Sequence, residues 1–213
     1  RSPVSARPRV IATEAEPLRL VVVGAGGMGK AWLQAIADDP RTTVVGLVDL
    51  DRDRARTARG GRTDVVIGTD LAAVLDESAA QAVVNVTVPE AHHAVNVVAL
   101  ERGLPVLSEK PAAPDVATAL RSAAVAARAD WLLMISQSRR YLAAYDRLRA
   151  LVDGLGSLAL VRVELLKAPR FGGFREEMQH VFLVDMAIHA FDAVRHLIGE
   201  SPVAVTCTEW NPT

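Results

Sequence analysis

The sequence predicts an α/β protein, in which a doubly wound parallel sheet of the Rossmann type is followed by the start of an α+β domain. Three observations predict this class. Short apolar runs alternate with helical patterns of about 10–15 residues, which is typical of βαβ units. A glycine loop follows the first apolar run and opens the first helical pattern. After Arg140 the alternation stops, and longer elements in a different order take its place.

The predicted Rossmann domain spans residues 18–138. Its first strand runs from Leu18 to Gly24, and its continuous valines indicate a strand buried on both faces. Six such strands amount to one complete doubly wound domain. The expected strands are 18–24, 43–49, 65–68, 82–88, 105–108 and 131–136. The expected helices between them are 27–37, 51–59, 71–76, 90–101 and 115–128.

The pattern of residues 139–213 predicts the beginning of an α+β domain. Apolar residues alternate at Val161, Val163 and Leu165, as in a half-buried strand. Two strands alone make a marginal sheet, so we expect this domain to be incomplete within the sequence. The expected elements are helices at 141–152 and 182–197, strands at 158–167 and 203–210, and a loop at 169–178.

Composition narrows the class of protein. The chain has 213 residues, half of them hydrophobic, and a formal net charge of −1, which argues against a nucleic-acid partner. No apolar run is long enough to span a bilayer, and residues 1–17 are expected to form a disordered tail rather than a signal peptide. We therefore expect a cytoplasmic protein. The lone cysteine, Cys207, excludes a disulfide framework and is expected to be a small buried side chain.

The glycine loop, residues 24–29 (Gly-Ala-Gly-Gly-Met-Gly), is built to hold a dinucleotide diphosphate. Gly24 permits the tight turn, Gly26 lets the phosphates approach the backbone, and Gly29 lets the helix pack close to the strand. The helix N-terminus adds free N–H groups and partial positive charge. A glycine-rich turn without nucleotide, or a flavin or SAM site, remains an alternative.

Asp49 ends the second predicted strand 20 residues after Gly29. A carboxylate at this place accepts hydrogen bonds from the adenosine ribose and repels a 2′-phosphate, which favours NAD over NADP. Arg52 and Arg54 lie close by and keep NADP as an alternative.

Lys110 follows the fifth predicted strand in the segment Glu109-Lys110-Pro111. Ligands of open parallel sheets lie beyond the carboxyl ends of the strands, so we expect Lys110 to face the cofactor crevice. There an ammonium group can stabilise negative charge on a substrate oxygen. The alternative is a solvated surface lysine.

The helix predicted at 182–197 carries Asp185, His189, Asp192 and His196 on one helical stripe. A histidine one turn from a carboxylate is a suitable acid–base pair, which singles out Asp185 and His189. The alternative is a polar stripe that faces water, and we expect Asp192 and His196 to do so. His92 and His93 open an earlier helix, either near the nicotinamide or on the surface. None of these groups has the spacing of metal ligands.

In their order along the chain, these motifs resemble the Gfo/Idh/MocA oxidoreductase family. The specific part is the combination of the Ser-Glu-Lys-Pro segment ending at Pro111 with the Asp-x-x-x-His helix at Asp185 and His189. The resemblance begins at about Leu18 and extends to the end of the chain.

The resemblance implies NAD(P)-dependent hydride transfer to or from a sugar, cyclitol or related polyol, in a homo-oligomer. It implies that Lys110 is the catalytic lysine with a cis bond to Pro111, that His189 moves the hydroxyl proton, and that Asp185 positions the substrate or His189. It also implies a second domain with a mostly antiparallel sheet, used for substrate binding and dimerisation. The residues expected to bind the cofactor are Gly24, Gly26, Gly27, Met28, Gly29, Asp49, Thr87, Pro89, His92, Glu109 and Lys110.

The sequence departs from the family pattern in two ways. Residues 179–183 replace the glycine-rich stretch usual before the Asp-x-x-x-His helix, which leaves the shape of the substrate pocket open. The second domain stops after its second predicted strand, as in a C-terminally truncated form. A non-catalytic NAD-binding sensor or partner module, or a fragment that folds with a partner chain, is therefore an alternative to an active dehydrogenase.

Overall fold

A computed structural model describes residues 12–166, 172–176 and 178–210. The described residues divide into two units, which end and begin at Ser136 and Gln137. The first unit is built on a six-stranded sheet in the order β3-β2-β1-β4-β5-β6, and every neighbouring pair is parallel. The predicted doubly wound sheet is therefore confirmed. The strands are β1 (Leu18–Val23), β2 (Thr42–Val48), β3 (Val66–Gly68), β4 (Ala82–Asn85), β5 (Val106–Ser108) and β6 (Leu133–Ile135).

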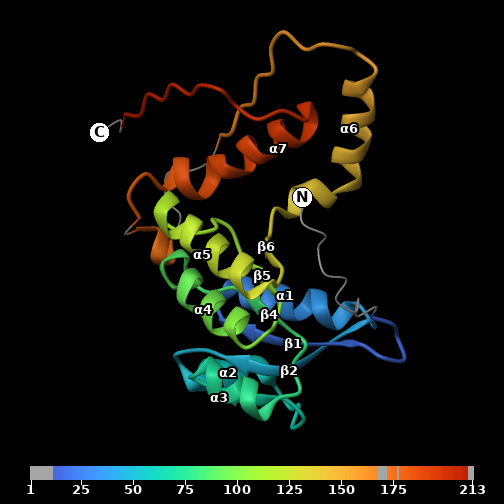
Figure 1. Cartoon of the computed structure of the whole chain (residues 1–213), viewed down its shortest axis with the longest axis vertical. Coiled ribbons are helices and arrows are strands. Elements are labelled where there is room, and N and C mark those ends of the chain that lie inside the picture. Colours follow the sequence, from blue (N-terminus) through green and yellow to red (C-terminus); the bar gives the residue numbers. More distant parts are fainter. Residues whose placement is uncertain (1–11, 167–171, 177, 211–213) are drawn as a thin grey trace. The chain divides into compact units, whose positions relative to one another are not determined.

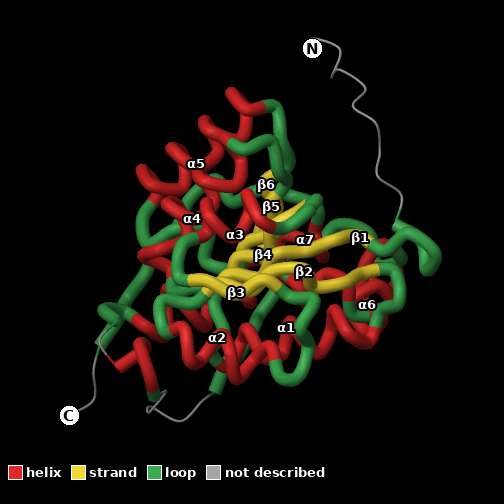
Figure 2. The backbone as a smooth tube through the Cα atoms, turned by 90° about the horizontal axis from the view of Figure 1, so that it is seen from below, coloured by secondary structure: helices red, strands yellow, loops and turns green. Residues whose placement is uncertain are grey.

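Five helices cover the two faces of this sheet (Figure 2). The helices are α1 (Gly27–Asp38), α2 (Arg52–Arg59), α3 (Leu71–Glu77), α4 (Pro89–Glu101) and α5 (Val116–Ala129). One apolar cluster joins alternate strand residues such as Leu20 and Val22 to Ile36 of α1 and Ala55 of α2. The other cluster joins the intervening residues to α3, α4 and α5. Because successive strand side chains point to opposite faces, the continuous valine runs supply both clusters.

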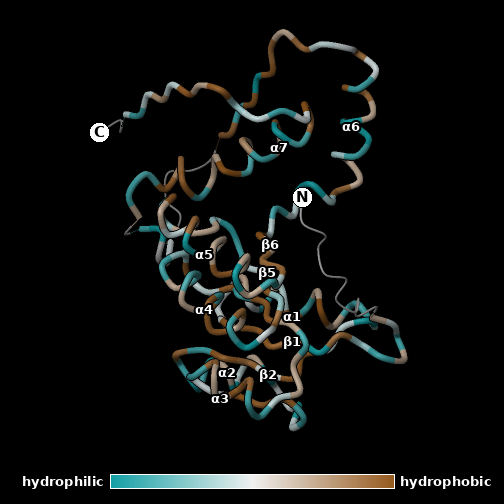
Figure 3. The backbone as a smooth tube through the Cα atoms, viewed as in Figure 1, coloured by the Kyte–Doolittle hydropathy of each residue, from teal (hydrophilic) through white to brown (hydrophobic). Residues whose placement is uncertain are grey.

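The strands that supply both clusters are drawn mostly in brown, the colour of hydrophobic residues, in Figure 3. Capping residues begin three of the surrounding helices, because each carboxylate accepts hydrogen bonds from amides of the first helical turn. Asp51, Asp70 and Asp115 play this part for α2, α3 and α5. As in α4, no side chain caps the first turn of α1, whose N-cap residue is Gly26. Its first amides are left for another partner.

The second unit contains α6 (Ala143–Asp153), a π-helical segment at Phe182–Ala187 and α7 (Ile188–Ile198), as coloured in Figure 1. Short 3₁₀ turns lie at Ser138–Tyr141 and Gly173–Glu176. The helix expected at 182–197 is thus a π-helix followed by an α-helix. The loop expected at 169–178 lies partly outside the described residues.

The two strands predicted for the second unit were wrong. Residues 158–166 and 203–210 form no strand in the structure, and side chains such as Leu160, Leu166 and Val203 are exposed. Alternation of apolar residues indicates a face able to pack, but a strand also needs a neighbour for its backbone hydrogen bonds. The expected burial of Cys207 was also wrong, because this residue lies in the second of these segments and is exposed.

Residues 12–17 of the predicted tail contain no helix or strand, although the Thr13 hydroxyl accepts a hydrogen bond from the Glu16 amide. The remainder of the predicted tail lies outside the described residues. Within the described ranges, no helix has both the length and the apolar character needed to cross a bilayer.

Candidate functional site

The glycine loop joins β1 to α1, and two of its glycines are required by close packing. Gly24 has φ +105°, and a Cβ there would lie 2.7 Å from the Val86 carbonyl oxygen. At Gly29 a Cβ would lie only 2.1 Å from the Gly24 carbonyl oxygen. Helix α1 can therefore begin directly against the end of β1 only because both positions lack side chains.

The other two glycines of the loop border open space. Nothing lies within 4 Å of a Cβ built at Gly26 or Gly27. The uncapped first turn of α1 begins here, and Met28 within it is 49% exposed. Free amides, the positive end of a helix and room beside the backbone are what a diphosphate needs. These residues therefore fit the diphosphate of a dinucleotide.

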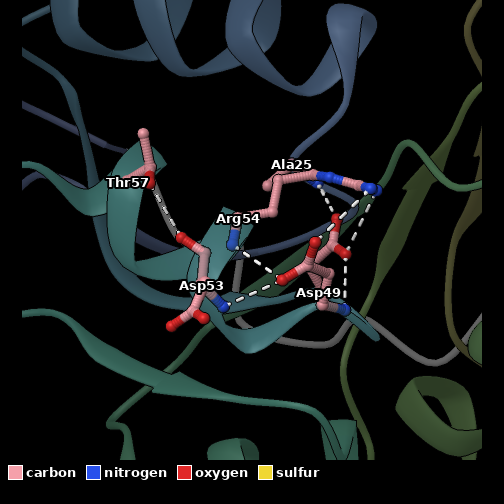
Figure 4. A network of polar contacts seen from close by, with 6 residues as sticks. Ala25, Asp49, Asp53, Arg54 and Thr57 are labelled. Atoms are coloured by element: carbon pink, nitrogen blue, oxygen red, sulfur yellow. Dashed lines mark hydrogen bonds and ion pairs between the residues drawn. The ribbon is translucent and has the colours of Figure 1, made fainter.

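Asp49 lies directly after β2, with its side chain 8% exposed, and holds the glycine loop in place (Figure 4). Its Oδ2 accepts a hydrogen bond from the Ala25 amide at 2.8 Å, and its Oδ1 accepts one from the Asp51 amide at 2.9 Å. The Arg54 guanidinium lies 3.5 Å from Oδ1. A carboxylate has about four acceptor sites, so these donors leave room for one more hydrogen bond. The contact with Ala25 was not foreseen from the sequence.

The segment after β4 is fixed by a buried amide. The Thr87 amide and hydroxyl donate to Oδ1 of Asn85, at 3.2 and 2.7 Å. Pro89 follows as the first residue of α4 and is buried. His92, one turn later, is fully buried, and its ring contacts main-chain oxygens of Thr87 and Pro111. Asn85 was not identified from the sequence, although its partners Thr87, His92 and Asn96 lie only 2, 7 and 11 residues later.

Lys110 lies after β5 and is half-buried, and its bond to Pro111 is cis, as the family resemblance implied. The neighbouring Glu109 carboxylate accepts a hydrogen bond from the Trp32 indole at 2.9 Å and one from the Lys110 amide at 3.1 Å. Trp32 belongs to α1, the helix that begins in the glycine loop. The hydrogen bond between Trp32 and Glu109 thereby attaches the segment that carries Lys110 to α1, the helix whose first turn would bind the diphosphate. No sequence spacing pointed to Trp32.

Asp185 lies in the π-helical segment of the second unit and is 1% exposed. The Arg175 guanidinium donates to its Oδ2 at 2.6 Å. His189 lies one residue inside α7. A π-helix adds about one residue to each turn, so the even stripe assumed for a continuous α-helix does not extend across Ala187. Arg175 was not identified from the sequence, because it lies in a separate 3₁₀ turn.

The expectation that Asp192 faces water was wrong. Asp192 is 7% exposed and accepts hydrogen bonds from Nε of Arg140, at 2.9 and 2.8 Å, as well as from its Nη2. The Asp192 carboxylate raises the pKa of Arg140 above its ordinary value, because it stabilises the charged guanidinium. The apolar pattern of α7 predicted which face is buried but not that an arginine 52 residues earlier supplies a partner.

We expect Asp192→Ala to lower the free energy of unfolding by about 1–3 kcal/mol, because Arg140 keeps its charge and loses its acceptor. Urea unfolding followed by circular dichroism measures this change. Glu200→Ala removes an exposed carboxylate from the same unit and should change stability by less than about 0.5 kcal/mol. Equal effects of the two substitutions would show that the Arg140–Asp192 pair contributes nothing specific.

An open cavity of about 520 Å³ lies between α1, β2 and α2. Its lining includes Lys30, Leu33, Thr42 and Arg59, and none of the predicted site residues. We assign no function to this cavity, because its size alone does not identify a ligand.

Comparison with known proteins gives three results. A family model described as "Oxidoreductase family, NAD-binding Rossmann fold" (GFO_IDH_MocA) matches residues 18–137. Inositol 2-dehydrogenase of Streptomyces avermitilis is 34% identical over 203 residues, which cover 92% of this chain and 57% of that protein. The chain thus spans little more than half the length of this curated relative.

Solved structures share the fold. The structure of GenD2 from gentamicin A biosynthesis, in complex with NAD, has a TM-score of 0.76 at 24% identity, and the match covers 91% of this chain and 56% of that chain. The structure of myo-inositol 2-dehydrogenase from Lactobacillus plantarum has a TM-score of 0.71 at 20% identity and covers 88% and 58% of the two chains. At these identities the likeness concerns the fold.

Proposed function

Because the chain belongs to the Gfo/Idh/MocA oxidoreductase family, whose fold is an NAD-binding Rossmann domain, we propose that it takes part in hydride transfer between NAD and a polyol. The proposed substrate class is a sugar, a cyclitol or a related hydroxylated ring. The relative named inositol 2-dehydrogenase supports a cyclitol in particular. The observation that carries the proposal is the open, uncapped start of α1 at Gly26, beside the buried carboxylate of Asp49.

Different residues of the first unit would bind different parts of the cofactor. The amides around Gly26, Gly27 and Met28 would bind the diphosphate, and Asp49 would accept a hydrogen bond from the adenosine ribose. Thr87, Pro89 and Glu109 lie at the ends of β4 and β5, where the nicotinamide half of a dinucleotide belongs. The cofactor supplies the hydride chemistry, and the protein aligns the substrate with it.

Three further residues would act on the substrate itself. The Lys110 ammonium would donate a hydrogen bond to the substrate oxygen and stabilise negative charge that develops there. His189 would accept the hydroxyl proton as a general base, and Asp185 would orient the substrate or His189. Arg175, which pairs with Asp185, would hold that carboxylate in place.

Calorimetric titration with NAD⁺ and NADP⁺ tests the binding part of the proposal. We expect NAD⁺ to bind about 10–100-fold more tightly, because the Asp49 carboxylate would repel a 2′-phosphate. A screen of cyclitols and sugars for NADH formation, followed at 340 nm, tests the catalytic part. Well-folded protein that takes up no nicotinamide dinucleotide at millimolar concentration would contradict the proposal.

A substitution at Asp49 should change the preference between the two cofactors. We expect Asp49→Ser to weaken NAD⁺ binding about 10–100-fold, because the ribose loses a charged acceptor and the Ala25 amide loses its partner. NADP⁺ should lose less, since the charge that repels it is gone and Arg54 remains nearby. Titration with both cofactors measures the ratio of the two dissociation constants.

Asp51→Ser is the matched control for this experiment. Asp51 caps α2, and serine caps a helix as well as aspartate does. The control removes a charge two residues from Asp49 but leaves the contact between Asp49 and the glycine loop. An equal change of cofactor preference in both variants would assign the preference to general charge rather than to Asp49.

A further inference from the structure

The imidazole of His92 lies between two main-chain segments that follow neighbouring strands. Its Nδ1 is 2.8 Å from the Pro111 carbonyl oxygen, and its Nε2 is 3.1 Å from the Thr87 carbonyl oxygen. The side chain is 0% exposed. Either tautomer of a neutral imidazole donates to one of these oxygens, and the doubly protonated ring donates to both. A neutral ring thus bonds one of the two segments and packs against the other, and a ring protonated at Nδ1 holds the Pro111 carbonyl oxygen.

These two segments matter for the proposed chemistry. Thr87 follows β4, and Pro111 is the residue directly after Lys110. Strands β4 and β5 are parallel neighbours, so both segments lie at the carboxyl edge of the sheet, where Rossmann folds bind their ligands. A contact at the Pro111 carbonyl acts on the backbone next to the proposed catalytic lysine.

His92 is itself held firmly. The Asn85 amide group donates to the His92 carbonyl oxygen at 3.2 Å and to Oδ1 of Asn96 at 2.8 Å. Oδ1 of Asn85 accepts hydrogen bonds from the Thr87 amide and hydroxyl. The Asn85 side chain therefore joins the end of β4 to the start of α4. Asn85, His92 and Asn96 are all fully buried. A buried, bonded polar group of this kind has few alternative arrangements and can hold its neighbours at fixed positions.

We propose that His92 is a positioning residue, which holds the Lys110–Pro111 segment against the Thr87 turn and thereby orients the Lys110 ammonium for the reaction. The inference rests on the proposed hydride-transfer function. The sequence led us to expect His92 among the residues that bind the cofactor, but its side chain is fully buried, and in this scheme it contacts neither substrate nor cofactor. It acts on Lys110 through the Pro111 carbonyl oxygen.

Three substitutions separate the two contacts of the ring. His92→Asn places an amide nitrogen near the position of Nδ1 and can keep the bond to Pro111. His92→Gln places its amide near Nε2 and can keep the bond to Thr87, whereas His92→Leu keeps neither. The matched control is His93→Gln, because His93 is the next residue of α4 and contacts Ser122 of α5 instead.

We expect kcat for the NAD⁺-dependent oxidation of myo-inositol to fall about 10–100-fold in His92→Leu and His92→Gln. The KM for NAD⁺ should stay within about threefold, because the diphosphate and ribose contacts are untouched. His92→Asn should recover most of kcat, and His93→Gln should match the wild type. Hydrogen–deuterium exchange should be about tenfold faster in a peptide spanning residues 107–113 of His92→Leu and His92→Gln, and unchanged in His92→Asn.

The outcomes distinguish this inference from the function on which it rests. Unchanged exchange in residues 107–113 of His92→Leu and His92→Gln would overturn it, even if the wild type oxidised no polyol. A wild type that binds no NAD⁺ contradicts the proposed function, and the exchange data still decide whether His92 holds the segment. If all three His92 variants lose stability but keep kcat per folded molecule, the residue is structural only and the inference is wrong.

Discussion

Gly29→Ala should abolish dinucleotide binding and destabilise the first unit together. The added methyl group would lie 2.1 Å from the Gly24 carbonyl oxygen, which is main chain and cannot rotate away. Helix α1 must therefore move off β1, and its first amides move with it. We expect a loss of at least about 3 kcal/mol in the free energy of unfolding, at the upper end of overpacking costs. We also expect NAD⁺ affinity to fall by about 100-fold or more, as two charged hydrogen bonds are lost.

Two other glycines serve as controls that separate folding from binding. Gly26→Ala places its methyl group in open space, so stability should change by less than about 1 kcal/mol. The same methyl group would occupy the room proposed for the diphosphate, and NAD⁺ affinity should still fall about tenfold or more. Gly61→Ala, also in open space but outside the loop, should change neither quantity. Urea unfolding and calorimetry give the two readouts.

This series contradicts the proposed cradle if Gly26→Ala binds NAD⁺ as tightly as the wild type. In that case the opening beside α1 would be a surface feature of a glycine-rich turn. A loss of NAD⁺ affinity in Gly61→Ala would instead point to a general effect on folding.

The second large effect is expected at Lys110. Lys110→Met keeps most of the side-chain length and removes the ammonium group, so kcat for polyol oxidation should fall about 10²–10³-fold. NAD⁺ affinity should stay within about threefold of the wild type, because the diphosphate and ribose contacts lie elsewhere. Steady-state kinetics with myo-inositol and NAD⁺, combined with calorimetry, separate the two quantities.

Arg128→Met is the matched control, because it removes a cation of similar length from the last turn of α5, where the Arg128 side chain is 69% exposed. It should leave both kcat and NAD⁺ affinity unchanged. If Lys110→Met retains kcat, the Lys110 ammonium has no catalytic part. If only NAD⁺ affinity falls, Lys110 binds the cofactor rather than the reacting oxygen.

The sequence predicted the first unit well because the signals for it are local. Each strand of the sheet is a short apolar run, and the helices that follow begin at residues such as Asp51 or Pro89. The main differences lie at strand ends. The fourth strand was expected to reach Val88 but ends at Asn85, where the Asn85 side chain turns the chain at Thr87.

The sequence predicted the contacts between distant residues poorly. The Asp49–Ala25, Trp32–Glu109 and Arg140–Asp192 bonds join residues 24, 77 and 52 positions apart, and no periodicity within a helix or strand encodes such a pair. The two failed strand predictions, at 158–166 and 203–210, have the same cause. Alternation of apolar residues indicates an apolar face, but it does not show which strand would pair with the segment. The sequence showed the type of each residue and its position along the chain. The hydrogen-bond partners of these residues could be identified only from the fold.

Helix α1 contacts both the proposed diphosphate site and the segment that carries Lys110. Its first turn faces the space for the diphosphate, and its Trp32 indole is bonded to the residue before Lys110. A small tilt of α1 would therefore also move the segment that carries Lys110. Binding of the diphosphate at the glycine loop and orientation of the Lys110 ammonium group are thus mechanically linked. The indole also makes this linkage observable, because its emission should report any displacement of α1 once Trp131 and Trp210 are replaced by phenylalanine.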